Sequence, residues 1–217
     1  MTESIKLSST VHAANDLIAR SNRMLFAGKK VKVLNMISSP GSGKTAILER
    51  MARAWGPALA VITGDIQTTF DADRLSGAGA TALQIETGGS CHLNAAMVQK
   101  ALNAMNLDAK KLLVIENVGN LVCPSTFDLG ETCKVAVLSV TEGDEKPAKY
   151  PALFTRAAAV IINKIDLLPY VTFSIDRVKA DCAKLNSAVE LFPVSAKTGE
   201  GFEEWMEFCN KLKGDQK

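Results

Sequence analysis

A short segment near the N-terminus combines small residues with a lysine and a hydroxyl group. Residues 38–45 read SSPGSGKT, which matches the phosphate-binding pattern GxxxxGK[ST] with a serine in place of the first glycine. Gly41 and Gly43 allow backbone N–H groups to turn toward phosphate oxygens, and the helix that follows adds its dipole. Lys44 is expected between the β- and γ-phosphates, and Thr45 is expected on Mg²⁺. The predicted phosphate-binding residues are Pro40, Gly41, Ser42, Gly43, Lys44, Thr45 and Ala46.

Two later segments, NKID and SAK, each follow an apolar run and indicate how a purine base is read. Asp166 is expected to accept hydrogen bonds from guanine N1–H and the exocyclic amine, which adenine does not present there. We expect the stem of Lys164 on the base plane, Asn163 against the phosphate loop, and the Ala196 N–H on guanine O6. Because an unpaired buried Asp166 would be costly beside adenine, the segments predict GTP rather than ATP. The predicted base-binding residues are Asn163, Lys164, Asp166, Ser195, Ala196 and Lys197.

Carboxylates stand at the ends of two other apolar runs, at Asp65 and Glu116. The carboxyl ends of parallel strands face the nucleotide in open α/β sheets. Both side chains are therefore candidates to hold Mg²⁺, directly or through water, although a helix-capping role stays open for Asp65. Gly119 is expected to bring its N–H close to the γ-phosphate. The predicted catalytic residues are Lys44, Thr45, Asp65 and Glu116: Lys44 would stabilise charge on the γ-phosphate during GTP hydrolysis, and the other three would hold the Mg²⁺ that does the same.

Nearly continuous runs of Val, Ile and Leu alternate with segments of helical period. Such runs are typical of parallel strands buried on both faces. The alternation predicts an α/β P-loop NTPase with a largely parallel sheet of about seven strands and helices on both faces. Strands are expected at 31–38, 58–64, 81–87, 111–118, 133–140, 158–164 and 189–195. Helices are expected at 43–55, 70–77, 93–106, 148–157, 175–186 and 200–213.

The length of 217 residues predicts a single G domain over residues 1–217. Residues 1–28 are expected to add an N-terminal helix, and residues 211–217 to form a frayed tail. The N-terminal helix is expected to be amphipathic, with one apolar stripe. That stripe consists of Val11, Ala14, Leu17, Ile18, Met24 and Leu25.

Composition argues against several classes of function. The chain has 25 Lys and Arg against 23 Asp and Glu, a net charge of +2. This balance disfavours nucleic acid or an anionic membrane as a partner. No apolar run approaches the roughly 20 residues that span a bilayer, and the N-terminus lacks a signal-peptide core, so a cytoplasmic protein is expected. The five cysteines are then expected to be free thiols or metal ligands.

Further segments carry a more specific pattern: GDIQTTFDADRL (64–75), TGGSCHLNAAMV (87–98), ENVGNLVCPSTFDLGE (116–131), EGDEKPAKYP (142–151) and NKIDLLPY (163–170). With the phosphate loop, they resemble the HypB family of nickel-insertion GTPases in [NiFe]-hydrogenase maturation. The resemblance runs from about residue 12 through the final helix. It implies a G domain of the signal-recognition/MinD class that forms a homodimer with GTP or metal bound. The implied partners are a nickel-delivery protein and the hydrogenase large-subunit precursor.

The resemblance also implies a metal site made by Cys91, His92 and Cys123. Thiolate and imidazole suit Ni²⁺ and Zn²⁺, and three ligands leave room for water or for a ligand from a second subunit. Without the family pattern, these residues alone favour free thiols. Some family members carry an N-terminal CxxCGC or histidine-rich stretch, whereas here the first cysteine is Cys91 and the other histidine is His12. Asn94 stands where the family often has Asp.

Spacing relates the two predicted sites. Cys123 lies four residues beyond Gly119, at most about 14 Å when fully extended. A change from GTP to GDP that moves Gly119 is therefore expected to reshape the metal site. Asn120, rather than glutamine, follows Gly119, so slow hydrolysis is expected. The apolar run at 167–171 is a candidate dimer surface.

Two alternatives remain at this stage. A urease-type nickel-insertion GTPase shares the chemistry, but its CPH metal motif is absent and CHLNA is present. A metal-binding or storage protein, with a nucleotide site that only sets its oligomeric state, is the second. A small-molecule kinase is disfavoured, because NKID specifies a purine and no second substrate pocket is indicated.

Overall fold

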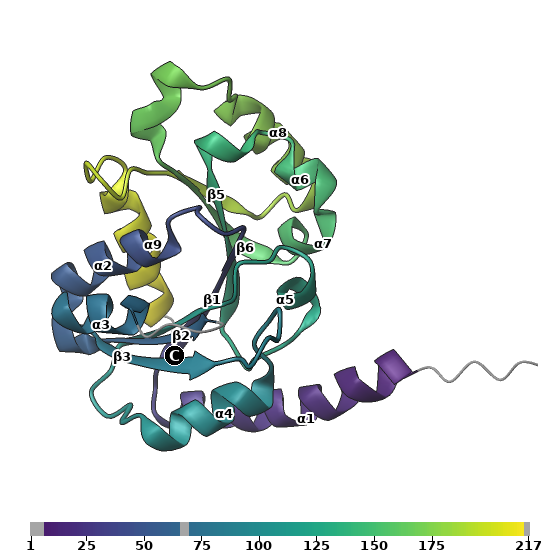
Figure 1. Cartoon of the computed structure of the whole chain (residues 1–217), viewed down its shortest axis with the longest axis vertical. Coiled ribbons are helices and arrows are strands. Elements are labelled where there is room, and N and C mark those ends of the chain that lie inside the picture. The colour runs from purple at the N-terminus through teal and green to yellow at the C-terminus, as the bar shows by residue number, and fades with distance from the viewer. Residues whose placement is uncertain (1–6, 66–69, 215–217) are drawn as a thin grey trace, which may run out of the picture.

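The computed structural model describes residues 7–65 and 70–214 (Figure 1). Seven strands form one sheet in the order β3-β2-β4-β1-β5-β6-β7, and every pairing between neighbours is parallel. The strands are β1 Lys32–Ser38, β2 Leu59–Asp65, β3 Thr81–Glu86, β4 Leu112–Glu116, β5 Cys133–Ser139, β6 Ala157–Asn163 and β7 Glu190–Pro193. The predicted α/β class and the seven-stranded parallel sheet are therefore confirmed.

Helices cover both faces of the sheet (Figure 1). The α-helices are α1 Leu7–Gly28, α2 Lys44–Trp55, α3 Phe70–Gly77, α4 Ala95–Ala104, α5 Cys123–Thr126, α6 Lys146–Lys149, α7 Pro151–Phe154, α8 Ile175–Leu185 and α9 Phe202–Gly214. The 3₁₀ turns are η1 Gly56–Ala58, η2 Val140–Glu142 and η3 Ile165–Tyr170. One core cluster packs α2, α3 and α9 on one face. Two further clusters pack α4 and the end of α1, and α7 and α8, on the other.

Strand order places the ends of β4, β1 and β5 side by side at the centre of the sheet. Their side chains are buried in alternation toward both helical layers, as with Leu34 on one face and Val33 on the other. Apolar residues on both faces explain the continuous runs in the sequence. The loops that follow these strands therefore start from a rigid, buried framework and meet along one edge.

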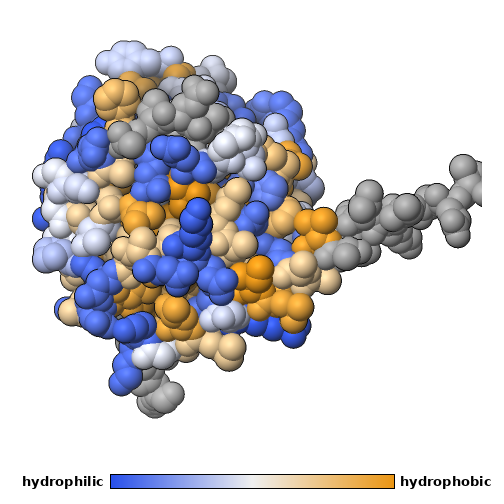
Figure 2. Space-filling model, turned by 60° about the horizontal axis from the view of Figure 1, so that its bottom comes forward, coloured by the Kyte–Doolittle hydropathy of each residue, from blue (hydrophilic) through white to orange (hydrophobic). Residues whose placement is uncertain are grey.

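Helix α1 buries a different face from the predicted one. Val11, Leu17 and Met24 of the predicted apolar stripe are exposed, and Met24 is 70% exposed. Within residues 11–28 of this helix, the buried residues are Asn15, Ala19, Asn22 and Phe26. The two buried amides are tolerated because backbone groups of Ala95 and of residues 128–129 hydrogen-bond with them. Figure 2 shows apolar and polar residues interspersed over the face that α1 and α4 form.

One other predicted element is wrong. The helix expected at 148–157 is two four-residue helices, α6 and α7, separated at Tyr150. The interruption has a simple cause, since the residue before a proline avoids the helical region and Pro151 follows Tyr150, whose ψ is 52°. At the C-terminus, α9 runs to Gly214 and Leu212 packs on the core, and the frayed tail expected at 211–217 stays a prediction. Residues 215–217 and 1–6 lie outside the described chain.

Across residues 7–65 and 70–214, no helix combines the length and the apolar character needed to cross a membrane.

Candidate functional site

The phosphate loop joins the buried strand β1 to helix α2. Gly41 and Gly43 have φ values of +76° and +94°, a conformation that glycine adopts without strain. Lys44 opens the helix and is only 8% exposed. Its Nζ donates to Ser38 Oγ at 2.8 Å, and Ser42 Oγ donates to the same oxygen at 2.6 Å. The serine in place of the first glycine therefore anchors the loop lysine. Burial lowers the pKa of Lys44, and the charge of Glu116 opposes this shift.

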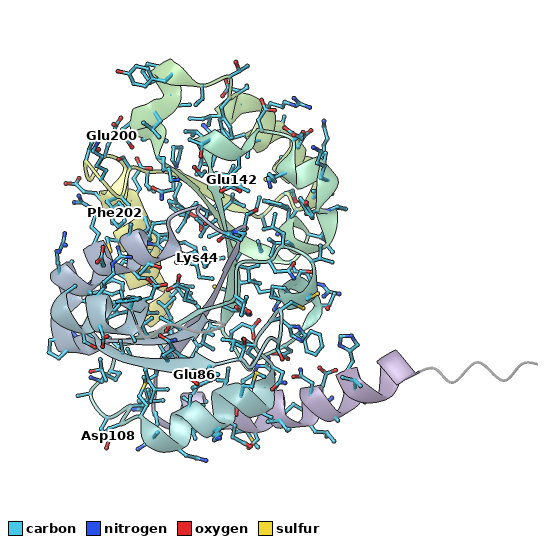
Figure 3. All side chains as sticks on the ribbon, viewed as in Figure 1. Lys44, Glu86, Asp108, Glu142, Glu200 and Phe202 are labelled. Carbon is cyan, nitrogen blue, oxygen red and sulfur yellow. The ribbon has the colours of Figure 1, made fainter. Side chains whose placement is uncertain are left out.

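A cavity of about 510 Å³ opens above the phosphate loop. Figure 3 shows Lys44 near the centre of the molecule. The lining residues are Pro40, Gly41, Gly43, Lys44, Thr45, Ala46, Gly64, Asp71, Arg74, Glu116, Asn117, Val118 and Gly119. This set includes most of the predicted phosphate-binding residues, together with Glu116 and Gly119. Ser42 is buried beneath the loop, and the side chain of Asp65, the last residue of β2, falls outside the described atoms.

Gly64, Asp71, Arg74, Asn117 and Val118 line the cavity but were not among the predicted site residues, and two of them, Asp71 and Arg74, carry charge. Arg74 pairs with Glu49 on α2 at 3.1 Å and with Asp71 on its own helix at 3.3 Å. The sequence held a signal for them, because an acid and a base three residues apart follow the second strand and share one side of α3. Asp71 adds a carboxylate to the cavity wall, and Arg74 adds a cation.

Glu116 lies at the end of β4 and is 6% exposed. Thr45 Oγ1 donates to its Oε1 at 2.9 Å, whereas its buried Oε2 has no partner among the described residues. Burial raises the pKa of Glu116 to about 7, against the opposing effects of Lys44 and Thr45. A buried carboxylate oxygen without a partner, beside a threonine hydroxyl, fits the oxygen ligands that Mg²⁺ prefers.

The buried Glu116 carboxyl predicts that the ligand-free protein loses stability as pH rises and this group ionises. The folded-state pKa of Glu116 rises from 4.5 to about 7. The loss of unfolding free energy is therefore absent below pH 4.5, where the carboxyl is protonated in the folded and unfolded states. It is fully present above pH 7, at about 3 kcal/mol. We expect Glu116→Gln, which stays neutral, to gain about 2–3 kcal/mol in unfolding free energy over the parent between pH 5 and pH 8. Urea unfolding at each pH, without nucleotide and Mg²⁺, measures this free energy for both proteins. The exposed Glu200→Gln is the control, and equal pH profiles for parent and Glu116→Gln would contradict the assignment.

The predicted base-binding loops meet the phosphate loop directly. Asn163 Nδ2 donates to Ser42 O at 2.9 Å, and Lys164 Nζ donates to Gly41 O at 2.7 Å. Ser195 Oγ donates to Asp166 Oδ1 at 2.6 Å, which fixes the orientation of that carboxylate. The Ala196 N–H donates to Asn163 Oδ1 at 3.0 Å, so a bond to guanine O6 would share or replace this contact. Arg50 holds the carbonyls of Ala196 and Lys197.

The predicted metal ligands converge. One ligand atom from each of Cys91, His92 and Cys123 lies within 4.8 Å of the others, and Cys91 Sγ is 3.6 Å from His92 Nδ1. A hydrogen bond with Cys123 raises the pKa of Cys91, and burial lowers that of His92. Two sulfur donors and one imidazole in this space fit a soft divalent cation. Asn94 is the N-cap of α4, where its side chain accepts from Met97 N at 2.9 Å.

The segment between Gly119 and Cys123 connects the cavity to this cluster. A Cβ at Gly119 would come within 2.9 Å of Pro40 Cγ, so only glycine allows the segment to approach the phosphate loop this closely. Asn120 Nδ2 donates to Cys91 O at 3.4 Å, and Asn120 Oδ1 accepts from Val122 N at 2.8 Å. Asn120 therefore joins the two metal-bearing loops, which are the loop that carries Cys91 and His92 and the loop that carries Cys123.

Comparisons with known proteins agree with this arrangement. Residues 32–193 match the family model described as CobW/HypB/UreG, nucleotide-binding domain. The chain is 47% identical to the hydrogenase maturation factor HypB of Escherichia coli (strain K12), over 88% of this chain and 67% of that protein. It is 41% identical to the hydrogenase/urease maturation factor HypB of Helicobacter hepaticus, over 96% of this chain and 88% of that protein.

The fold is also shared with a solved structure of a relative. The crystal structure of HypB from Helicobacter pylori in complex with nickel superposes with a TM-score of 0.90 at 41% identity. The match covers 93% of this chain and 96% of that one. By sequence and by fold, the chain belongs to the HypB family of hydrogenase maturation factors, within the CobW/HypB/UreG nucleotide-binding proteins.

Proposed function

We propose that this chain is a nickel metallochaperone GTPase, with residues 1–217 acting as one G domain. It would bind GTP, hydrolyse it slowly to GDP and phosphate, and couple this reaction to nickel delivery in [NiFe]-hydrogenase maturation. The observation that carries the proposal is the segment 119–123, which contacts the phosphate loop at one end and supplies a metal-cluster thiol at the other. The names of the relatives and the nickel complex of one of them support it.

The cavity residues account for how GTP would be held and cleaved. Lys44 would exchange its bond to Ser38 for phosphate oxygens, where it and the loop N–H groups stabilise the charge that builds as water attacks. Thr45, Glu116 and Asp65 would hold Mg²⁺, which neutralises phosphate charge when bound. The Asn120 side chain is engaged with Cys91 and Val122, so it is not free to orient water. A slow reaction follows.

The metal cluster would take Ni²⁺, or Zn²⁺, as cargo. Cys91 is exposed, and His92 and Cys123 are half-buried, so a metal bound there would lie at the surface of one subunit. Water or a second copy of the chain would then supply the missing ligands. We propose a homodimer promoted by GTP, by metal, or by both, with a nickel-delivery protein and the hydrogenase large-subunit precursor as further partners.

Three single substitutions test the metal site. Cys91→Ala, His92→Ala and Cys123→Ala should each abolish stoichiometric Ni²⁺ binding while GTP affinity changes less than about twofold, because the ligands lie outside the phosphate cavity. Loading should release protons, because thiols with a pKa above neutral must ionise. Isothermal titration in buffers of different ionisation enthalpy measures Ni²⁺ binding and the number of protons released. Light scattering with a GTP analogue bound measures whether the protein is a dimer.

Cys133→Ala is the matched control, because this partly buried thiol on β5 lies outside the cluster. Parent-like Ni²⁺ binding in both the Cys91 and Cys123 variants would refute the site. A monomer at tens of micromolar protein, with GTP analogue and Ni²⁺ bound, would refute the dimer.

A urease as the recipient of the metal is the second candidate, since the H. hepaticus relative is named a hydrogenase/urease maturation factor. Deleting the gene and assaying hydrogenase and urease in the same cells separates the two targets. Loss of urease activity with intact hydrogenase activity would favour the second.

A further inference from the structure

A buried amide lies between the phosphate cavity and the metal cluster. Asn117 follows the last residue of β4 and is 1% exposed. Its Oδ1 accepts two backbone hydrogen bonds, from Leu93 N and from Val118 N, each at 3.0 Å. Leu93 is the residue after His92, and Val118 is the residue before Gly119. Asn117 Oδ1 therefore holds two segments at once: the loop that carries His92, and the segment around Gly119 that is expected to sense the γ-phosphate.

The other end of the same amide continues the connection. Asn117 Nδ2 donates to Asn35 Oδ1 at 3.1 Å, and Asn35 Nδ2 donates to Glu131 Oε1 at 3.2 Å. Glu131 Oε2 accepts from Leu129 N at 2.6 Å, close to the end of the loop that carries Cys123. Asn35 and Glu131 are buried as well. A continuous chain of hydrogen bonds thus joins both metal-bearing loops to the end of β4.

Such a buried network is rigid when every bond is made, and it loses stability when one member moves alone. An unsatisfied buried donor costs about 1–3 kcal/mol, and low local polarity strengthens the remaining bonds. A shift of Val118 and Gly119 toward a γ-phosphate would therefore pull on Asn117, and Asn117 would pull on Leu93. This link is independent of the chain connection between Gly119 and Cys123.

We propose that Asn117 is the positioning residue that transmits the nucleotide state to Cys91 and His92. Its carboxamide oxygen makes the N–H of Leu93 follow the N–H of Val118. The residue acts through the two backbone segments that its side-chain oxygen holds. This inference rests on the proposed function, in which nucleotide and Ni²⁺ bind the same chain.

The opposite side of the metal loops offers a control. Asn15 on α1 accepts from Ala95 N at 2.9 Å and donates to Asp128 O at 2.8 Å. It therefore braces the same two loops as Asn117 but has no hydrogen bond to the segment around Val118. Its loss should loosen the metal loops in every nucleotide state equally.

The experiment compares Ni²⁺ dissociation constants with GDP and with a non-hydrolysable GTP analogue. The parent ratio should differ from one by about fivefold or more. Asn117→Ala should bring the ratio to within about twofold of one. Asn15→Ala should weaken Ni²⁺ binding in both states and keep the parent ratio. If Asn117→Ala does not fold, Asn117→Ser removes the same bridge with a smaller void.

The outcomes separate the two levels of the argument. A parent that binds no Ni²⁺, or hydrolyses no GTP, overturns the proposed function and this inference with it. A parent ratio of one leaves nickel binding and GTP hydrolysis in place but overturns the transmission. A parent ratio of fivefold or more that persists in the folded alanine or serine variant overturns the role of Asn117 alone. Collapse of the ratio in that variant, with the parent ratio kept in Asn15→Ala, supports it.

Discussion

Asp166→Asn is expected to lower GTP affinity by about 3–4 kcal/mol, roughly several hundred-fold, and to favour xanthine nucleotides instead. In the structure, Ser195 Oγ donates to Asp166 Oδ1 at 2.6 Å. That bond leaves the second carboxylate oxygen for the guanine N1–H and amine. In the variant, the amide can keep the bond to Ser195 and present its N–H₂ group to the base. Guanine then meets a donor where it needs an acceptor, whereas xanthine offers a carbonyl.

The measurement is fluorescence titration with labelled guanine and xanthine nucleotides. Asp181→Asn is the matched control, because Asp181 is an aspartate on α8 whose carboxylate pairs with Lys184 at 2.9 Å. It should bind both nucleotides as the parent does. Parent-like GTP affinity in a folded Asp166→Asn protein would show that this loop does not read the base.

The framework of the site could be predicted because its signals are local. The phosphate loop depends on residues 38–45, and its neighbouring strand and helix follow from apolar runs and from helical period. The parallel sheet then brings the ends of β1 and β4 together, which places Glu116 beside Thr45. No long-range contact had to be known for this step, since parallel strands end at one edge.

The parts that could not be predicted depend on partners distant in sequence. The apolar stripe predicted on α1 is exposed because the buried face is built around Asn15 and Asn22, whose partners lie more than 70 residues away. Asn117 looked like an ordinary polar residue after a strand, and only the fold shows that it holds Leu93. Buried polar residues are satisfied by backbone groups that periodicity does not reveal.

Glu116 illustrates why the site is strained without its ligands. Its carboxylate is buried beside Lys44, yet one oxygen has no partner among the described residues. A charged group in this position is stable only when further positive charge compensates for lost solvation. Lysine and carboxylate therefore depend on one another in the ligand-free protein, and both would gain partners when GTP and Mg²⁺ bind. Without Lys44, the pKa of Glu116 would rise further and the carboxyl would take up a proton, so removing the lysine should affect the reaction far more than the fold.

Lys44→Ala is accordingly expected to reduce multiple-turnover GTP hydrolysis by about 10²–10³-fold or more, because it removes the cation that stabilises developing phosphate charge. GTP affinity should fall as well. The fold should persist, since Lys44 is the first residue of α2, and alanine is the best helix former. Ser42 keeps its bond to Ser38 in the variant, so the loop retains one of its two anchors.

Phosphate release over many turnovers measures the rate, and circular dichroism checks the fold. Lys100→Ala, which removes an exposed lysine from α4, should hydrolyse GTP at the parent rate. Multiple turnover by the parent, lost in Lys44→Ala, distinguishes a GTPase from a metal-storage protein whose nucleotide only sets its assembly. The latter would bind GTP once and release no phosphate in either protein. Parent-like turnover by a folded Lys44→Ala protein would instead show that the lysine of the phosphate loop is not needed for the reaction.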